Sequence, residues 1–211
     1  MTEQLRSTPP RPRKLDLPKM TYEQFLEWDF ENPHVEWVKG EVIEMAPVSG
    51  DHQDLRSFLL VLFRMFIEEH DLGQLLDDPF QMKTGDDLPG RAPDIQFISK
   101  RNLGRLKKNH LSGPADLVVE IISPGSRGTD RGDKFYEYEK GGVKEYWLID
   151  PERKRAEFYR LGRDKQYQLI EVGNDGIVRS LVLKGLWLKV DWLWQRPLPK
   201  LKTVLKEWGL V

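Results

Sequence analysis

The sequence predicts an α/β fold in which a central mixed β-sheet is flanked by helices. One long segment repeats apolar residues at helical spacing, and several short runs rich in β-branched and aromatic residues have the character of strands. These strands group as a meander around one long helix and one mid-chain helix, which is typical of such a sheet. A chain of 211 residues can bury one sizeable core, so we expect one domain with a decorated periphery.

The amino-terminal residues 1–19 predict a flexible, basic and proline-rich arm, because they hold four of the 14 prolines and an excess of basic residues. The arm is either a solvated tail, which we favour, or a segment that contacts phosphate. Order is expected from residue 21, where Thr-Tyr-Glu-Gln has the form of a capping box and starts a short helix to about residue 30. Residues 34–45 alternate in polarity around a Lys-Gly pair and predict a hairpin.

The longest predicted helix covers about residues 52–70, where apolar residues recur at helical spacing after Asp51 as the expected cap. Four strands are expected after it, and the last of them is almost continuously apolar, as in a central strand covered on both faces. They lie at 74–76, 80–83, 92–98 and 116–122.

The second half of the chain predicts one helix and a run of strands. A polar loop leads into a helix at 134–140, which a Gly-Gly pair ends. A helix from about Leu201 closes the chain, and we assign 20–195 to the main domain and 196–211 to a helical extension. Strands with β-branched and aromatic enrichment follow the first helix at 143–150, 156–161 and 166–172.

Composition excludes several kinds of site. The chain has no cysteine, which rules out disulfide scaffolds, thiolate zinc sites and cysteine nucleophiles, so any metal must be held by oxygen or imidazole. The formal net charge of -1 gives no global attraction to phosphate, and a nucleic-acid role would need a local basic patch. A charged fraction of 32% predicts a heavily charged surface. An enzyme and a binding module both remain open.

The sequence lacks the signals of a membrane protein. No stretch approaches the ~18 consecutive apolar residues of a membrane span, and the first residues lack the apolar region of a secretory signal. We therefore expect a cytoplasmic protein without a membrane partner.

Glu120 is the most informative residue, because it lies between valines and isoleucines on the most apolar predicted strand. Burying its charge costs several kcal/mol unless a cation pairs with it. The cation is either an internal Arg or Lys, which makes the residue structural, or a metal ion. A general acid or base is the remaining reading.

Asp94 and Lys134 are the residues that would complete a site around Glu120. Asp94 follows Pro93 on the preceding strong strand, and two carboxylates on neighbouring strands form an oxygen pocket suited to Mg²⁺ or Mn²⁺. Lys134 begins the next helix and could turn back over the strand end to orient a water or stabilise charge on phosphate. Otherwise it forms an exposed pair with Asp130, worth ~0.3–0.5 kcal/mol. Tyr138 shares the helix face of Lys134.

The segments GRAPDIQFIS, DLVVEIISPGSRGTDRGDKFYEY and GGVKEYWLIDP resemble the PD-(D/E)XK nuclease superfamily. Within it, residues 20–194 resemble the large bacterial family called "putative restriction endonuclease", a domain of unknown function. The resemblance implies a restriction-endonuclease-like fold in which Asp94, Glu120 and the carbonyl of Ile121 hold the metal. The superfamily's lysine belongs two residues after the acid, where this chain has Ile122. In related families it can migrate to the following helix, where Lys134 stands.

Three polar residues in the first quarter of the chain match recurring positions of the same family: Glu36, Glu41 and His52. His52 is either a proton shuttle near the metal or an ordinary polar group at a helix start. For Glu41, the hairpin-surface reading stands slightly ahead of a supporting role in the site, and Glu36 ranks lower.

Basic residues predict where nucleic acid would be contacted. The run from Lys100 to His110 either follows a phosphate backbone or is a solvated loop. The resemblance also implies that two arginines after Glu120 lie near the scissile phosphate. The predicted contacts are Arg105, Lys107, Lys108, Arg127 and Arg131.

Three hypotheses follow. The leading one is a Mg²⁺-dependent endonuclease that hydrolyses phosphodiester bonds in DNA, for which the nuclease assignment rests on the resemblance. The second is a DNA-binding or regulatory protein that keeps the fold without turnover, as the Ile122 departure suggests. The third is a structural protein in which an internal cation neutralises Glu120. A homodimer would suit an enzyme that cuts both strands.

Overall fold

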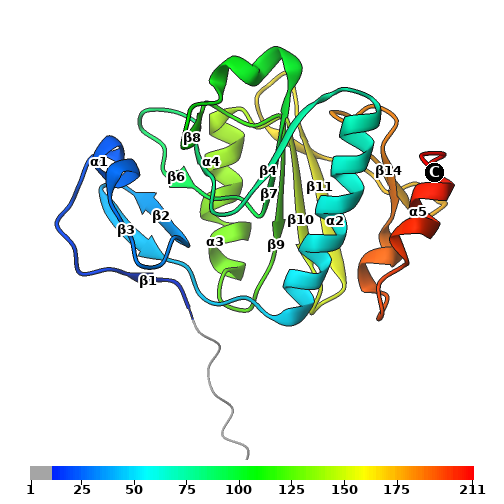
Figure 1. Cartoon of the computed structure of the whole chain (residues 1–211), viewed down its shortest axis with the longest axis horizontal. Helices are drawn as coiled ribbons and strands as arrows, with labels where there is room; N and C mark the ends of the chain where they lie inside the picture. Colours follow the sequence, from blue (N-terminus) through cyan, green and yellow to red (C-terminus); the bar gives the residue numbers. More distant parts are fainter. Residues whose placement is uncertain (1–10) are drawn as a thin grey trace, which may run out of the picture.

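A computed structural model describes residues 11–211 (Figure 1). Its central sheet has six strands in the order β12-β11-β10-β9-β7-β4. Only β9 and β10 pair in parallel, and the other neighbours are antiparallel, so the predicted mixed sheet is confirmed. The strands are β4 (Gly73–Asp77), β7 (Ile95–Ser99), β9 (Leu117–Ile121), β10 (Glu145–Asp150), β11 (Arg155–Leu161) and β12 (Tyr167–Leu169).

Helices cover both faces of this sheet, as the fold class predicts. The long helix α2 (Gly50–Glu69) covers one face, and α4 (Asp133–Gly141) covers the other (Figure 1). Because successive side chains of a strand point to opposite faces, Val119 and Ile121 pack toward α2, while Val118 and Ile122 pack toward α4. Glu120 therefore belongs to the α4 face.

The carboxyl-terminal elements extend the α2 side of the core. Helix α5 (Leu201–Glu207) begins where the sequence predicts it, and its residues Val204 and Leu205 join the same apolar cluster as α2. The short elements that precede it are β13 (Ile177–Arg179), β14 (Trp187–Lys189) and the 3-10 helix η2 (Val190–Trp194).

A second, smaller sheet lies beside the central one, with strand order β1-β3-β2-β6-β5-β8 (Figure 1). The capping box at Thr21 is confirmed, and it starts α1 (Tyr22–Glu27), which ends earlier than predicted. The predicted hairpin is confirmed too, with left-handed residues Lys39 (φ 52°) and Gly40 (φ 88°) at its turn. The strands are β1 (Arg13–Lys14), β2 (Val35–Val38), β3 (Glu41–Glu44), β5 (Gln81–Lys83), β6 (Gly90–Arg91) and β8 (His110–Ser112).

Several local features differ from the sequence prediction. Strand β1 pairs with β3, so Arg13 and Lys14 of the predicted arm join the small sheet, whereas residues 1–10 lie outside the described part. The cap of α2 is Ser49 and not Asp51, because the Ser49 hydroxyl accepts the backbone N–H of His52. The glycine-containing loop after β9 forms a short helix, α3 (Arg127–Arg131), which its composition does not predict.

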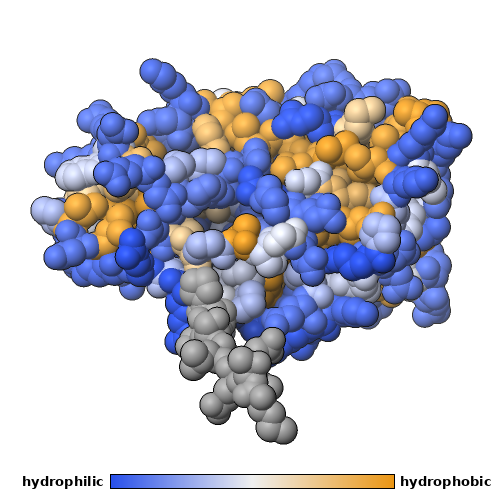
Figure 2. All heavy atoms as spheres, turned by 60° about the horizontal axis from the view of Figure 1, so that its bottom comes forward, coloured by the Kyte–Doolittle hydropathy of each residue, from blue (hydrophilic) through white to orange (hydrophobic). Residues whose placement is uncertain are grey.

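One face of the molecule is largely hydrophilic, as the charged composition predicts. Hydrophilic side chains cover much of the face in Figure 2, as the charged fraction predicts, and apolar side chains gather in separate patches. Within residues 11–211, no helix is long and apolar enough to cross a membrane.

Candidate active site

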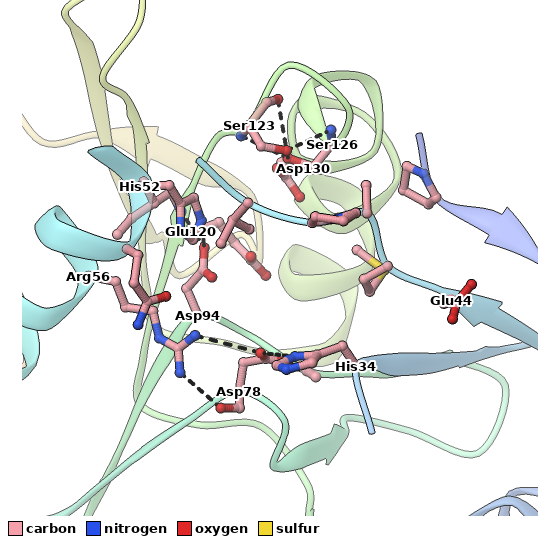
Figure 3. A pocket seen from close by; sticks show the side chains of 18 of the residues that line it. His34, Glu44, His52, Arg56, Asp78, Asp94, Glu120, Ser123, Ser126 and Asp130 are labelled. Carbon is pink, nitrogen blue, oxygen red and sulfur yellow. Dashed lines mark hydrogen bonds and ion pairs between the residues drawn. The ribbon is translucent and has the colours of Figure 1, made fainter. Parts of the chain in front are cut away.

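A cavity of about 430 Å³ lies at the seam between the two sheets (Figure 3). One wall comes from the ends of β7 and β9 and from α3 and α4, with Asp94, Glu120, Asp130 and Lys134. The opposite wall comes from the segment before β2, the residues after β3 and the start of α2. The cavity is therefore formed jointly by elements of both sheets.

Asp94 and Glu120 face each other across neighbouring strands. Ile95 pairs with Val119 in the antiparallel register of β7 and β9, and one further residue along this register sets Asp94 opposite Glu120. Directly opposite residues share a face of the sheet, with Cα atoms roughly 4.5–5.5 Å apart. The two predicted carboxylates thus meet at one end of the central sheet, as the sequence predicts.

Lys134 lies over the end of β9, where the sequence also predicts it. Its Nζ is 3.0 Å from Oε1 of Glu120, and the hydroxyl of Tyr138 donates to the same oxygen at 2.7 Å. Lys134 and Tyr138 are four residues apart on α4 and so occupy one face of the helix. Glu120 is 3% exposed and Lys134 2%, so this ion pair is buried.

Lys134 contacts two further carboxylates, each at 3.3 Å: Glu36 on β2 and Asp130 on α3. Glu36 has a second cationic partner, because Nη1 of Arg91 donates to it at 2.7 Å. Asp130 has no such partner within residues 11–211, and its Oδ1 is buried without a hydrogen bond there. One ammonium group therefore faces more buried carboxylate than it can neutralise.

The pKa values reflect this imbalance. Burial raises the pKa of Glu120 well above its usual range, and Asp130, Asp94 and Glu36 raise it further against the opposing effect of Lys134. Burial likewise raises the pKa of Asp130. Burial alone would lower the pKa of Lys134, but Glu120, Glu36 and Asp130 raise it well above its usual range. A buried site with perturbed groups and surplus negative charge favours an additional cation.

Asp94 is fixed by two donors. Its Oδ2 accepts the backbone N–H of Ile121 at 2.7 Å and lies 3.3 Å from Nε2 of His52 (Figure 3). Burial opposes ionisation, but the bonds from His52 and Ile121 hold the pKa of Asp94 below its usual value. His52 is 2% exposed, and its Nδ1 has no hydrogen-bond partner in the described chain. His52 is thus a buried neighbour of Asp94 and not a surface group.

The residues present fit a hydrated divalent cation. No group of three or more His, Asp or Glu side chains in residues 11–211 is arranged as a metal site. However, Oδ1 of Asp94 and Oε2 of Glu120 accept no hydrogen bond from the described residues, and both side chains line the cavity. Mg²⁺ is usually held by one or two carboxylates and keeps several waters, so two carboxylates and the Ile121 carbonyl are a sufficient donor set.

Glu41 lies outside the cavity. It stands on the surface of the hairpin, where Lys14 contacts its carboxylate at 2.8 Å and Lys19 at 3.7 Å. These cations and not a metal account for its lowered pKa. Glu41 therefore lies on the hairpin surface, as the favoured interpretation of the sequence predicts. Glu36, which the sequence analysis considers a weaker candidate than Glu41, instead reaches the buried carboxylate cluster.

The predicted nucleic-acid contacts do not line the cavity. The basic run forms the 3-10 helix η1 (Lys100–Arg105) and the loop after it, beyond the far end of β7, because β7 starts at the cavity and runs away from it. There Arg105 donates to the carbonyl of Pro114, and Lys107 to that of Gly104. The two arginines of α3 are held by the β10–β11 hairpin: Arg127 by Asp150 and Glu152, and Arg131 by Glu157.

The sequence analysis names Asp130 only as the partner of Lys134 in an exposed pair, whereas the structure buries this pair at the cavity, and it does not identify His34 or Asp78. Asp130 could be recognised only as a helical neighbour of Lys134, since α3 was not predicted. His34 lies just before β2 of the small sheet, and Asp78 lies just after β4 of the central sheet. The two residues are 44 positions apart in the sequence, so no local pattern connects them.

Comparisons with known proteins agree with this architecture. The Uma2 family model, described as "Putative restriction endonuclease", matches residues 22–191. The chain is similar in structure to a protein from Anabaena variabilis ATCC 29413 that is described as a "putative nuclease belonging to DUF820". The two share 20% identity over 83% of this chain and 97% of the other, with a TM-score of 0.67, which shows a common fold. Among curated proteins nothing matches. On the evidence of the family model, the chain belongs to the family described as "Putative restriction endonuclease".

Proposed function

We propose that this protein is a metal-dependent endonuclease that hydrolyses phosphodiester bonds in DNA. The observation that supports it most directly is the contact of Lys134 Nζ with Glu120 Oε1 at 3.0 Å, beside Asp94. Although Ile122 stands where the superfamily has its lysine, an ammonium group still reaches the acidic pair from α4. The chain thus has two carboxylates and a lysine on one wall of a cavity.

Each of these side chains has a defined task in the proposed reaction. Asp94, Glu120 and the carbonyl of Ile121 would hold Mg²⁺ or Mn²⁺, which supplies a charge that polarises the phosphate and acidifies water. Lys134 would donate a hydrogen bond to the attacking water or to the charge that develops on the phosphate oxygens. Because Lys134 is buried among carboxylates, it remains protonated and acts as a donor.

Two further residues orient the acidic pair. The Tyr138 hydroxyl donates to one oxygen of Glu120, and the other oxygen of this cavity-lining side chain has no donor among the described residues. His52 bonds Asp94 through Nε2 and holds that carboxylate against the Ile121 amide. Such outer contacts tune ligands without touching the metal, and their loss typically costs 10–100-fold in affinity or activity. His52 is therefore proposed as a positioning residue.

The structural alternative requires an internal cation for Glu120, and Lys134 is such a cation. Two features favour an active site instead. Asp130 and Glu120 share this lysine and remain under-neutralised, and the cluster opens into a cavity instead of being sealed by apolar side chains. The alternative of DNA binding without turnover rests on the missing motif lysine at Ile122, and the contact of Lys134 with Glu120 weighs against it.

The test is metal-dependent cleavage of supercoiled and branched DNA, with RNA as a separate substrate, at several Mg²⁺ and Mn²⁺ concentrations. We expect wild-type cleavage to fall at least about 100-fold in Asp94→Ala, Glu120→Ala and Lys134→Ala. Asp175→Ala is the matched control, because it removes a carboxylate from an exposed pair with Arg179 and should leave cleavage unchanged. Wild-type protein that binds DNA and never cuts it would support the binding alternative.

A further inference from the structure

A histidine–aspartate pair lies on the cavity wall that the small sheet contributes to. His34 precedes β2 and Asp78 follows β4, and Nδ1 of His34 is 2.6 Å from Oδ2 of Asp78 (Figure 3). Both residues line the cavity, but their exposure differs: the His34 side chain is 51% exposed and that of Asp78 14%. The imidazole thus reaches the open space while its partner is held behind it.

Asp78 is held in place by the long helix. Nη1 of Arg56 on α2 lies 3.6 Å from the Asp78 carboxylate, and Nη2 donates to the Asp78 carbonyl at 2.9 Å. The same Nη2 donates to Asp77 at 2.7 Å, so the guanidinium is anchored. Burial raises the pKa of Asp78, which makes its carboxylate a stronger acceptor for an imidazole N–H.

This arrangement determines what His34 can do. With Nδ1–H donating to Asp78, the second ring nitrogen, Nε2, is the one left for a ligand. Nε2 has no hydrogen bond within residues 11–211. A side chain that is oriented by a carboxylate and has a free ring nitrogen in a cavity is equipped for proton transfer. None of the tasks assigned above to Asp94, Glu120 and Lys134 uses it.

The position of His34 selects one of the two proton transfers in hydrolysis. In Figure 3, Asp94 lies between Asp130 on one side and the His34–Asp78 pair on the other. Lys134 contacts Glu120 and Asp130 on that side and also Glu36 on β2, and within residues 11–211 it forms no ion pair with Asp78. In-line displacement puts the attacking and leaving oxygens on opposite sides of phosphorus. If water is held at Lys134, the leaving oxygen faces His34.

We infer that His34, oriented by Asp78, is the acid that protonates the leaving oxygen, an inference that rests on the proposed nuclease function. The water oxygen forms a bond to phosphorus as the bond from phosphorus to the leaving sugar oxygen breaks. That oxygen takes the Nε2 proton of the His34 imidazolium, and the attacking water gives one proton to solvent. Solvent then returns a proton to His34, and the products are a phosphate monoester and an alcohol.

The experiment compares two substrates that differ in their need for this acid. An oligonucleotide has an alkoxide leaving group that needs a proton, whereas the p-nitrophenyl ester of thymidine 5′-phosphate releases a stable phenolate without one. We expect His34→Gln to slow oligonucleotide cleavage ~100-fold or more and to leave ester cleavage nearly unchanged. His70→Gln at the end of α2 is the matched control, since it removes an imidazole away from the cavity and should change neither rate.

Replacement of the carboxylate that orients His34 gives a second measurement. Asp78→Asn is the second variant, and it should show the same selective loss on the oligonucleotide.

Two results would overturn the inference. An equal loss on both substrates, with a lower Tm, would make the His34–Asp78 pair only a tie between the two sheets. Unchanged cleavage of both substrates by His34→Gln would exclude His34 from the reaction. Wild-type protein that cleaves neither substrate with any metal would refute the proposed function itself, which is a distinguishable failure.

Discussion

The two ends of the neighbouring strands β7 and β9 each hold a buried carboxylate, but the two ends are built differently. Asp116, just before β9, is 1% exposed and accepts the backbone N–H of Ser99 at 2.8 Å and its hydroxyl at 2.7 Å. Asn102 donates to both of its oxygens, and Lys144 pairs with it. These donors outweigh burial and lower the pKa of Asp116 to about 2.

At the other end, Glu120 is buried to a similar degree, yet burial raises its pKa well above the usual range. It accepts only from Lys134 and Tyr138 among the described residues, and it shares Lys134 with Asp130 and Glu36. Burial alone therefore does not mark a site. What distinguishes the two ends is the number of donors per carboxylate, and the under-supplied end is the one that opens into the cavity.

Replacing the lysine at each end should give the largest difference in the free energy of unfolding between the two ends. Lys134→Met leaves three buried carboxylates without their shared cation, and we expect the free energy of unfolding to fall by about 3–5 kcal/mol. Lys144→Met should cost less than about 1 kcal/mol, because Lys144 is partly exposed and Asp116 keeps its other donors. Urea denaturation at pH 7 in metal-free buffer measures both. Equal losses would contradict the difference between the two ends.

Adding a divalent cation should affect only the cavity end. We expect saturating Mg²⁺ to raise the Tm of the wild type, since about 2.7 kcal/mol of stability follows from a concentration 100 times Kd. Glu120→Gln keeps the acceptor for Tyr138 but loses the charge, so its Tm should not respond. Asp116→Asn is the control: its Tm should start lower and still rise with Mg²⁺. If Mg²⁺ raised the Tm of Glu120→Gln as much as that of the wild type, Glu120 would not be a metal ligand.

Acid should weaken the protein through the Asp116 end. The folded pKa of Asp116, about 2, lies below the ordinary 3.8, so its contribution is complete above pH 3.8 and is lost as pH falls toward 2. After screening by solvent, we expect this to be on the order of 1–2 kcal/mol. Unfolding measured between pH 5 and 2 should show a shallower decline in Asp116→Asn than in the wild type. If the stability of the wild type and of Asp116→Asn fell in parallel, other carboxylates would be responsible for the loss of stability in acid.

The central part of the site is predictable from the sequence because short-range rules determine it. Alternation along a strand puts Glu120 on a defined face, strand pairing puts Asp94 opposite it, and helix periodicity aligns Lys134 with Tyr138. The fold class follows from the same periodicities. These residues can be identified without knowing which distant parts of the chain come into contact.

The remaining parts depend on information that local patterns lack. Asp130 points into the cluster because a polar, glycine-containing loop folds into α3. The basic residues after Ser99 are near the acidic motifs in the sequence but at the opposite end of β7 in space, because each strand carries the chain across the sheet. The His34–Asp78 pair exists only where two sheets meet.

The seam between the sheets has a consequence for altering the specificity of the proposed nuclease. The carboxylates and Lys134 come from the central sheet and α4, whereas Met45, Ala46, Pro47 and Val48 connect the small sheet to α2 and face the same cavity. A combinatorial library confined to these four positions would reshape the space offered to a nucleotide while leaving the acidic pair untouched. On the proposed function, selectivity and chemistry would thus depend on separate segments of the chain, so specificity could change while the reaction centre stays fixed.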